Sequence, residues 1–581
     1  MSEKMTIRKV LIYTVLSLGL LLPASAFSQK KLSIIRYDSI HHPVIANHGM
    51  VVSQNSTATR VGQQILAQGG NAVDAAVAMG FALAVTLPRA GNLGGSGFML
   101  LHQAESNETL ALDYRSVAPL ATTLEKLQGE DGKIDLNRLT FGAAAPGVPG
   151  TVAGLHEAWQ RQGSMPWHDL LQPAYELASQ GIRVSDDLEY ALSIAVPALS
   201  RFPASKSIYL KNDKTSFKAG ELLVQADLAW SINQIQQHGA DAFYRGEVGQ
   251  RIVNAIQAGG GLINMEDLAA YKVRQRTPIA TTYRDHRVIS MPPVSAGGLT
   301  VLQMLNVLSN FDMTEYDQGS AKSLHLLAEV MKRAAANRRT YLGDPDFVVI
   351  PMEDYLSEQV ASDMAKSISL RKARKVKKID AEPLGIYKSR ETTHYSVIDR
   401  FGNAVSNTYT LGHSFGSAFV ADGTGILLDN QMRNFSYGQG PDQPNAMRPG
   451  KRMLSTMTPT MVFDTEGKIK LVTGTPGGGR IINVILQVLV NVIDYDMNIA
   501  EATHRPRIHQ GWRSQTLGVE DALGTDTIER LQKMGHEIQV QRSMGSTQSI
   551  MWENGLFYGS ADPRRPNALA LGLIKEPGSQ Q

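Results

Sequence analysis

The sequence has 581 residues, of which 43% are hydrophobic and 19% are charged, a composition that is typical of folded globular proteins and excludes collagen-like or disordered chains. Its formal net charge is +3, and residues 1–9 carry two of these positive units, so the remainder is nearly neutral and nothing indicates a nucleic-acid partner. The absence of Cys excludes disulfides, thiolate nucleophiles, Fe–S clusters and cysteine zinc sites, which leaves Ser, Thr, Lys or a carboxylate as a possible nucleophile.

The N-terminus has the pattern of an export signal. Charged residues 1–9 precede an apolar stretch at 10–22, and residues 23–26 read PASA, a cleavage site with small residues. The apolar stretch is too short to span a bilayer, and no later run of apolar residues is long enough to replace it. We therefore expect residues 1–26 to be removed, and the protein to be exported to the periplasm or secreted without a membrane anchor.

The first part of the mature chain is predominantly helical. Two helices are predicted within residues 55–87, the second of them apolar on all sides and therefore buried. A glycine-rich loop then leads into a strand at 91–103, and a further strand follows at 110–119. Residues 150–260 and 320–370 have helical periodicity.

The pattern changes near residues 379–391, which are polar, contain Pro and lack periodicity, as in an exposed connection. Two alternating segments, 394–399 and 403–410, then flank a short turn and predict a hairpin. More strands follow, with a helix within 478–496. Helices dominate the first half and strands the second, so the predicted fold class is α/β, with sheets built from both halves and covered by helices.

Residues 470–487 combine a strand, a glycine turn and a helix start, as in a phosphate-binding loop. Arg480 and Ile481 stand where such a loop requires Lys and Ser or Thr, so a nucleotide site is not expected. Gly477 and Gly478 could still direct backbone N–H groups toward an oxyanion at the helix N-terminus. The alternative is an ordinary tight turn.

Other motifs give no catalytic or metal site. The glycine loop at 91–97 lacks the final glycine of a nucleophile elbow around Ser96. His41, His42 and the remaining histidines do not have the spacing of metal ligands, so no metal or cofactor is predicted. The basic run at 371–378 is interpreted as a solvated tether.

The remaining candidate is the sequence ETTHYS, at the start of the predicted hairpin. Thr is common in strands, so an ordinary strand is one interpretation. The other requires cleavage of the bond between Glu391 and Thr392. Thr392 would then carry both a hydroxyl and an α-amine, whose pKa is about 7.7–8.0 in model peptides, and so would supply nucleophile and base together.

Taken together, the motifs resemble those of the γ-glutamyltranspeptidase (glutathione hydrolase) family of N-terminal nucleophile hydrolases. The resemblance extends from about residue 45 to residue 574. It rests on the segments GGNAVDAAVA, AGNLGGSGFM, LDYRSVAP, AAPGVPGTVAG, YLGDPDF, TTHYSVIDRFGNAV, GILLDNQM, LSTMTPT, TGTPGGGR and MGSTQSI.

This resemblance implies a four-layer αββα sandwich made as one precursor. After removal of residues 1–26, self-cleavage would give a large subunit, 27–391, and a small catalytic subunit, 392–581, which remain together as a heterodimer. Thr392 would then take a γ-glutamyl group from glutathione or another γ-glutamyl amide and pass it to water or to an amino acid or peptide. No cofactor is required.

The resemblance also assigns site residues. Thr410 would position the Thr392 hydroxyl, and Gly477 and Gly478 would form the oxyanion hole. The α-carboxylate of the glutamyl group would be bound by Arg115, Ser455 and Thr456. Its α-amine would be bound by Gln431.

The sequence departs from the family pattern at three places. Asn434 replaces an aspartate that pairs with the α-ammonium group, which removes a full charge. Gly412 and His413 replace a segment with a substrate-binding amide, and residues 436–450 form a shorter lid segment than in many relatives. Two alternatives therefore stay open: a glutaryl acylase of the same superfamily, and an uncleaved binding protein without activity.

Overall fold

In a computed structural model, the described residues are 39–211, 215–375, 391–438, 440, 442–511 and 516–575. The predicted signal segment, and the predicted connection up to residue 390, lie outside these ranges. None of the described helices has both the length and the apolar character that a membrane span requires.

Two seven-stranded sheets form the centre of residues 41–575, and every pairing within them is antiparallel. The first sheet contains, in spatial order, β1 (Val44–Ala46), β22 (Leu556–Ala561), β21 (Gln548–Glu553), β17 (Ile469–Thr473), β16 (Thr460–Phe463), β11 (His286–Ser290) and β10 (Ile279–Tyr283). The second contains β23 (Leu569–Gly572), β2 (Gly49–Ser53), β12 (Glu391–Asp399), β13 (Ala404–Gly412), β3 (Ser96–Gln103), β4 (Glu108–Tyr114) and β9 (Arg274–Arg276).

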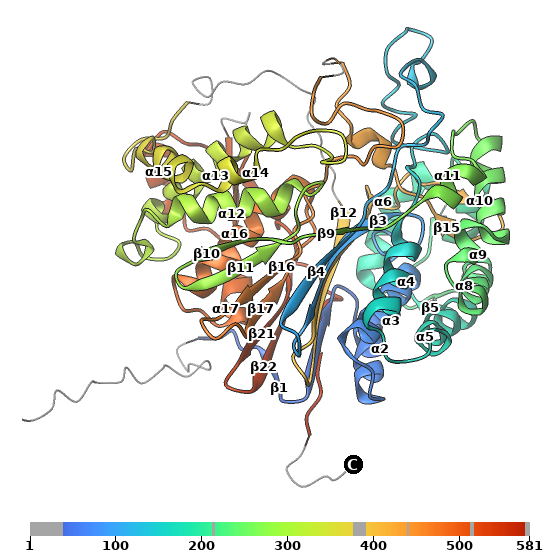
Figure 1. Ribbon diagram of the computed structural model, residues 1–581, viewed down its shortest axis with the longest axis horizontal. Coiled ribbons are helices and arrows are strands. Elements are labelled where there is room, and N and C mark those ends of the chain that lie inside the picture. The colour runs from blue at the N-terminus through green and yellow to red at the C-terminus, as the bar shows by residue number, and fades with distance from the viewer. Residues whose placement is uncertain are drawn as a thin grey trace, which may run out of the picture. The chain divides into compact units, whose positions relative to one another are not determined.

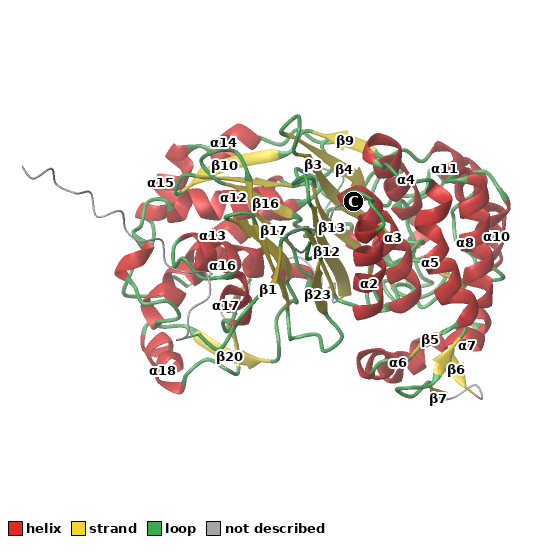
Figure 2. Cartoon of the chain, turned by 90° about the horizontal axis from the view of Figure 1, so that it is seen from below, coloured by secondary structure: helices red, strands yellow, loops and turns green. Residues whose placement is uncertain are grey.

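Helices cover the outer face of each sheet, so the described fold has four layers, helix–sheet–sheet–helix (Figures 1 and 2). The helices beside the second sheet are α2 (Ser56–Ala67), α3 (Ala72–Thr86), α4 (Thr151–Gln162), α5 (Trp167–Gln180), α6 (Asp186–Leu199), α7 (Pro203–Tyr209), α8 (Ala226–His238), α9 (Asp241–Tyr244), α10 (Glu247–Ala258) and α11 (Met265–Ala270). Those beside the first sheet are α12 (Ala296–Leu308), α13 (Ala321–Tyr341), α14 (Met352–Leu356), α15 (Glu358–Lys366), α16 (Ile481–Ile493), α17 (Ile499–His504) and α18 (Thr525–Lys533).

Smaller elements connect these layers. They are the three-stranded sheet β18 (Ile508–Gln510), β19 (Thr516–Glu520) and β20 (Glu537–Gln541), and the two-stranded pairs β5 (Ile182–Arg183) with β8 (Leu222–Leu223), β6 (Leu210–Lys211) with β7 (Thr215–Ser216), and β14 (Val420–Ala421) with β15 (Ile426–Leu427). Short 3-10 turns occur at Glu125–Leu127, Met313–Glu315, Gln431–Asn434 and Gly478–Arg480.

The predicted buried helix is α3. The Asn71 side chain caps its N-terminus, and the Asp74 carboxylate accepts a hydrogen bond from the Asn71 backbone N–H, which completes a capping box. All of its side chains are buried, and it packs against β12 and β13. An apolar surface on every side therefore places this helix in the core, as the sequence predicts.

The predicted hairpin forms the middle of the second sheet. β12 pairs with β13 on one side and with β2 on the other, and β13 pairs in turn with β3. Strands from residues after position 391 thus lie between strands from residues before it. Two pieces produced by a cut at this position would still share one hydrogen-bonded sheet.

Candidate active site

One cavity of substrate size adjoins Thr392. Its volume is about 320 Å³, which is within the roughly 300–1,000 Å³ that small-molecule sites occupy. Seven of the nine predicted site residues line it: Arg115, Thr392, Thr410, Asn434, Ser455, Thr456 and Gly478. The other two, Gln431 and Gly477, are not among the lining residues.

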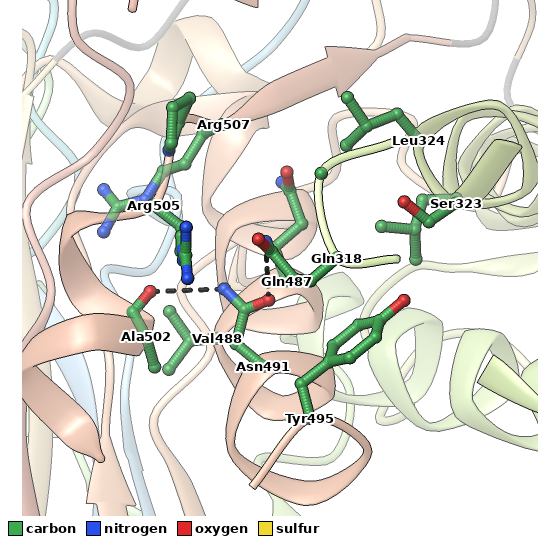
Figure 3. Close-up of a pocket in the computed structure, with 13 residues that line it drawn as sticks. Gln318, Ser323, Leu324, Gln487, Val488, Asn491, Tyr495, Ala502, Arg505 and Arg507 are labelled. Carbon is green, nitrogen blue, oxygen red and sulfur yellow. Dashed lines mark hydrogen bonds between the residues drawn. The ribbon is translucent and has the colours of Figure 1, made fainter. Parts of the chain in front are cut away.

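Figure 3 shows a second cavity, which none of the predicted site residues lines. Gln318 donates a hydrogen bond of 3.2 Å to Asn491, and Asn491 donates one of 3.3 Å to the carbonyl oxygen of Ala502. The space left between them is about 10 Å³, enough for about one water molecule. This cavity is too small for a substrate.

Thr392 lies where the ladder between β12 and β13 is irregular. Glu391 is paired with Gly412, but Thr393 is paired with Tyr409, so the register shifts at Thr392. Such bulges change the direction of a side chain and are common beside active sites. Thr392 is 3% exposed, and what remains accessible faces the cavity.

The hydroxyl of Thr410 connects the groups around the predicted cut. It donates a hydrogen bond of 2.8 Å to the carbonyl oxygen of Glu391. It accepts one of 3.3 Å from the Thr392 hydroxyl and one of 2.8 Å from the backbone N–H of Gly412. A hydroxyl has one donor and two acceptor positions, so all three are used and the orientation of Thr410 is fixed.

A series of hydrogen bonds links Arg115 to β13, the strand that carries Thr410. Arg115 donates to the Ser96 hydroxyl (3.2 Å) and to the carbonyl oxygen of Met453 (3.0 Å). Ser96 donates to the side-chain oxygen of Gln431 (2.9 Å), whose amide nitrogen donates to the carbonyl oxygen of Thr410 (3.0 Å). Gln431 thus connects the arginine of the cavity to the strand that carries Thr410.

The buried carboxyl group of Asp429 supports this series of hydrogen bonds. Asp429 accepts hydrogen bonds from the backbone N–H of Gln431 (3.1 Å) and of Gly147 (3.0 Å), and another from the Ser116 hydroxyl. Burial raises the pKa of Asp429 to about 7, although these hydrogen bonds and the charge of Arg115 act in the opposite direction. Its position holds the start of the turn that carries Gln431.

The predicted hydroxyl pair and the predicted oxyanion loop are in contact. Thr456 donates a hydrogen bond of 2.9 Å to the carbonyl oxygen of Gly478. Gly477 and Gly478 both have positive φ values, 135° and 56°, which favour glycine. Ser455 lies beside Thr456, and its hydroxyl accepts the backbone N–H of Met457 at 3.2 Å.

The described lining of the cavity contains three arginines, Arg115, Arg338 and Arg433, and no Asp or Glu. Arg433 donates a hydrogen bond of 3.0 Å to the carbonyl oxygen of Leu136 and another to the Thr140 hydroxyl. The neighbouring Asn434, predicted to replace an aspartate, also lines the cavity. The cavity therefore favours anionic substrate groups.

Gly412 is required by close packing. Its φ is 95°, and a Cβ atom there would lie 2.3 Å from the side-chain oxygen of Asn430. The same oxygen accepts the backbone N–H of His413 at 3.1 Å. A side chain at position 412 would not fit this arrangement.

Among the described residues, no three His, Cys, Asp or Glu side chains come close enough together to hold a metal ion.

Comparison with known proteins identifies the family. The sequence model of the Gamma-glutamyltranspeptidase family matches residues 58–572. This chain belongs to the γ-glutamyltranspeptidase family. It is 45% identical over 576 residues to the glutathione hydrolase proenzyme of Escherichia coli (strain K12), a match that covers 97% of this chain and 99% of the relative. It is an enzyme of the γ-glutamyl hydrolase and transferase class.

Acylases are also related to this γ-glutamyltranspeptidase family member. An acylase ACY 1 proenzyme of Pseudomonas sp. (strain SE83) is 34% identical, over 92% of this chain and 96% of the relative. A cephalosporin acylase structure from Bacillus halodurans has a TM-score of 0.82 at 26% identity, over 93% of this chain and 99% of that one. A Helicobacter pylori γ-glutamyltranspeptidase chain has a TM-score of 0.55 at 36% identity, over 60% of this chain and 97% of that one.

Sequence reasoning missed several residues of this family member's site. Ser96 was rejected as a nucleophile, but its hydroxyl lies between Arg115 and Gln431. Asp429 lies within the segment GILLDNQM, but the sequence analysis assigned it no role of its own. Arg338 and Arg433 occur in ordinary helical and loop sequence, and their place in the cavity lining depends on tertiary structure.

Proposed function

We propose that the chain cuts itself between Glu391 and Thr392. Removal of residues 1–26 on export, to the periplasm or the medium, and the cut would give subunits 27–391 and 392–581. These would remain together as a heterodimer because β12 and β13 are paired with β2 and β3. The contact that supports this proposal best is the hydrogen-bonded sequence from the Thr392 hydroxyl through Thr410 to the Glu391 carbonyl oxygen.

The self-cleavage begins with attack of the Thr392 Oγ on the carbonyl carbon of Glu391. The new C–O bond replaces the C–N bond, the hydroxyl proton ends on the released nitrogen, and an ester joins the two residues. Thr410 donates to the carbonyl oxygen while negative charge develops there. Water then hydrolyses the ester, which leaves the Glu391 carboxylate and the free amine and hydroxyl of Thr392.

In the mature enzyme the same hydroxyl would attack the γ-carbonyl group of glutathione or another γ-glutamyl amide. The α-amine of Thr392 takes the hydroxyl proton and gives it to the leaving nitrogen. The backbone N–H groups of Gly477 and Gly478 stabilise the oxyanion. The γ-glutamyl ester then passes to water or to the amine of an amino acid or peptide.

Recognition of the donor would begin with its α-carboxylate. Arg115, Ser455 and Thr456 line the cavity, and a guanidinium group matches a carboxylate in shape and charge. Asn434 would accept a hydrogen bond from the α-ammonium group. Gln431 would act through Ser96 and Thr410, to which it is bonded.

A glutaryl amide is the second candidate donor. It lacks the α-amine, and the described lining of the cavity has no carboxylate to bind that amine. Comparison of γ-glutamyl and glutaryl p-nitroanilides tests the choice. We expect a higher kcat/KM for the γ-glutamyl compound; a clear preference for glutaryl would assign the enzyme to the acylases.

Self-cleavage is tested on a denaturing gel of the exported protein. We expect bands of roughly 40 and 21 kDa, judged from the chain lengths. N-terminal sequencing should begin at Phe27 in the larger band and at Thr392 in the smaller. A Thr392→Ala variant should give one uncut band. A single band from the wild type would support the uncleaved binding protein instead.

A further inference from the structure

The side chain of Glu391, the residue before the proposed cut, is held by a buried arginine. Arg89 Nη1 donates to the Glu391 carboxylate at 3.2 Å, and Arg89 Nη2 lies 2.9 Å from the carboxylate of Asp187. The side chains of Arg89 and Glu391 are only 7% and 17% exposed. Solvent therefore screens this ion pair much less than one on the surface.

Arg89 is itself fixed in place. It lies in the turn that follows α3, and its carbonyl oxygen accepts the backbone N–H of Phe415 at 3.0 Å. Asp187, in the first turn of α6, holds the other side of the guanidinium group. The arginine thus joins Glu391 to two helices of the layer beside the second sheet.

Glu391 is consequently held at two points. Arg89 binds its carboxylate, and Thr410 donates to its carbonyl oxygen at 2.8 Å. The strand is irregular at the next residue, so its ladder alone does not define the position of this carbonyl group. A displacement of about 1 Å at a reacting carbon can lower a rate on the order of 100-fold.

We propose that Arg89 is a positioning residue for self-cleavage, and that it acts in the precursor only. It holds Glu391 so that the carbonyl group keeps its hydrogen bond with Thr410, which also binds the Thr392 hydroxyl. The inference rests on the proposed cut between Glu391 and Thr392. Once that bond is broken, Arg89 holds a residue that is no longer attached to the nucleophile.

The test separates the rate of self-cleavage from the turnover of enzyme already cut. Arg89→Met should slow the appearance of the smaller band by at least tenfold, and Glu391→Gln by at least threefold. Arg89→Lys, which keeps the charge, should recover part of the rate. Cut enzyme isolated from each variant should retain kcat for γ-glutamyl-p-nitroanilide within twofold of the wild type.

A double variant tests whether both residues act through one contact. Arg89→Met combined with Glu391→Gln should cleave no more slowly than Arg89→Met alone, because the contact is already lost. A double variant whose losses multiply would overturn the proposal.

Asp187→Asn is the matched control for structural damage, because Asp187 binds the same arginine but is not next to the cut. All variants are also made in the uncut Thr392→Ala background, where the melting temperature measures loss of stability. We expect Arg89→Met and Asp187→Asn to lower the melting temperature, but Asp187→Asn to slow cleavage less than threefold.

Several results would overturn the role of Arg89. They are unchanged cleavage in Arg89→Met, equal slowing in Asp187→Asn, or a parallel fall in the kcat of cut enzyme. A wild-type chain that stays uncut, or whose smaller band does not begin at Thr392, would instead overturn the proposed function.

Discussion

Thr392 and Thr410 lie on paired strands, and the hydroxyl of Thr392 donates a hydrogen bond of 3.3 Å to that of Thr410. Thr410 also donates to the carbonyl oxygen of Glu391 at 2.8 Å. One residue thus contacts both the attacking group and the group that it would attack. After the cut, the first of these contacts can still orient the nucleophile, so Thr410 serves both the maturation and the turnover that we propose.

Replacement of Thr410 tests this double role. Thr410→Val keeps the shape but removes the hydroxyl, and we expect both self-cleavage and turnover to fall roughly 100- to 1,000-fold, as for loss of one oxyanion donor. Thr410→Ser, the control, should remain within tenfold of the wild type. Gel densitometry and p-nitroanilide release measure the two rates. Normal cleavage in Thr410→Val would contradict the role of its hydroxyl.

Asn434 should determine how well the α-ammonium group is recognised. A charge-assisted hydrogen bond contributes about 1 kcal/mol more than a neutral one. Asn434→Asp should therefore raise the ratio of kcat/KM for γ-glutamyl over glutaryl p-nitroanilide by roughly five- to tenfold. Gln443→Glu adds the same charge elsewhere in the cavity lining and should change this ratio less. An equal increase in both variants would show that only the net charge of the cavity matters.

Arg338 should bind a carboxylate of the leaving group or the acceptor. It lines the cavity from the end of α13, and within the described residues no carboxylate pairs with it. Arg338→Gln should reduce kcat/KM for γ-glutamyl-3-carboxy-4-nitroanilide about fivefold relative to the uncarboxylated anilide, since a charge-assisted contact is lost.

Arg433→Gln is the matched control for Arg338, because it removes a second positive charge from the same cavity lining. We expect it to leave the ratio between the two anilides nearly constant. If both variants lower the ratio equally, the preference for the carboxylated anilide comes from the overall positive charge of the cavity rather than from a contact with Arg338. Glycylglycine and its amide, compared as acceptors, give the same test for the transfer reaction.

The sequence was sufficient to predict the elements that carry the nucleophile. The predicted hairpin segments, 394–399 and 403–410, correspond to β12 and β13 to within a few residues, and the apolar segment after Asn71 forms α3. Both predictions depend on local pattern and capping, which neighbouring residues determine. The predicted layers and the family were confirmed by the sheets and by the comparisons.

Features that depend on tertiary contacts were not predictable. β10 and β11 are joined by Arg284 and Asp285, both with positive φ, a conformation that Asp adopts more readily than most residues but Arg does not. Arg284 is held there by Asp494, at 3.0 Å, and by the carbonyl oxygen of Leu308. The contact between Arg89 and Glu391 was missed for the same reason, because 302 positions separate the two residues.

The acid stability of the protein should depend on buried neutral histidines, of which His394 is the one nearest the nucleophile. Burial lowers the pKa of His394 to about 3, and its ring bonds the hydroxyls of Thr408 (2.8 Å) and Ser396 (3.0 Å). In the unfolded chain this pKa is near 6.5. Between these two pH values the unfolded state therefore binds more protons than the folded state. The contribution of His394 to the free energy of unfolding is fully present above pH 6.5 and is lost as the pH decreases toward 3.

We expect His394 to contribute a slope of up to about 1.4 kcal/mol per pH unit within this window. Asp429 contributes a slope of the opposite sign, because its pKa is raised to about 7 in the folded state. Its contribution to stability is present below pH 4 and is lost as the pH rises through 7. Urea unfolding of the uncut Thr392→Ala chain between pH 4 and 6.5 measures the slope. His394→Gln should reduce it, whereas His168→Gln, at an exposed position, should not. An unchanged slope in His394→Gln would show that this histidine does not govern acid unfolding.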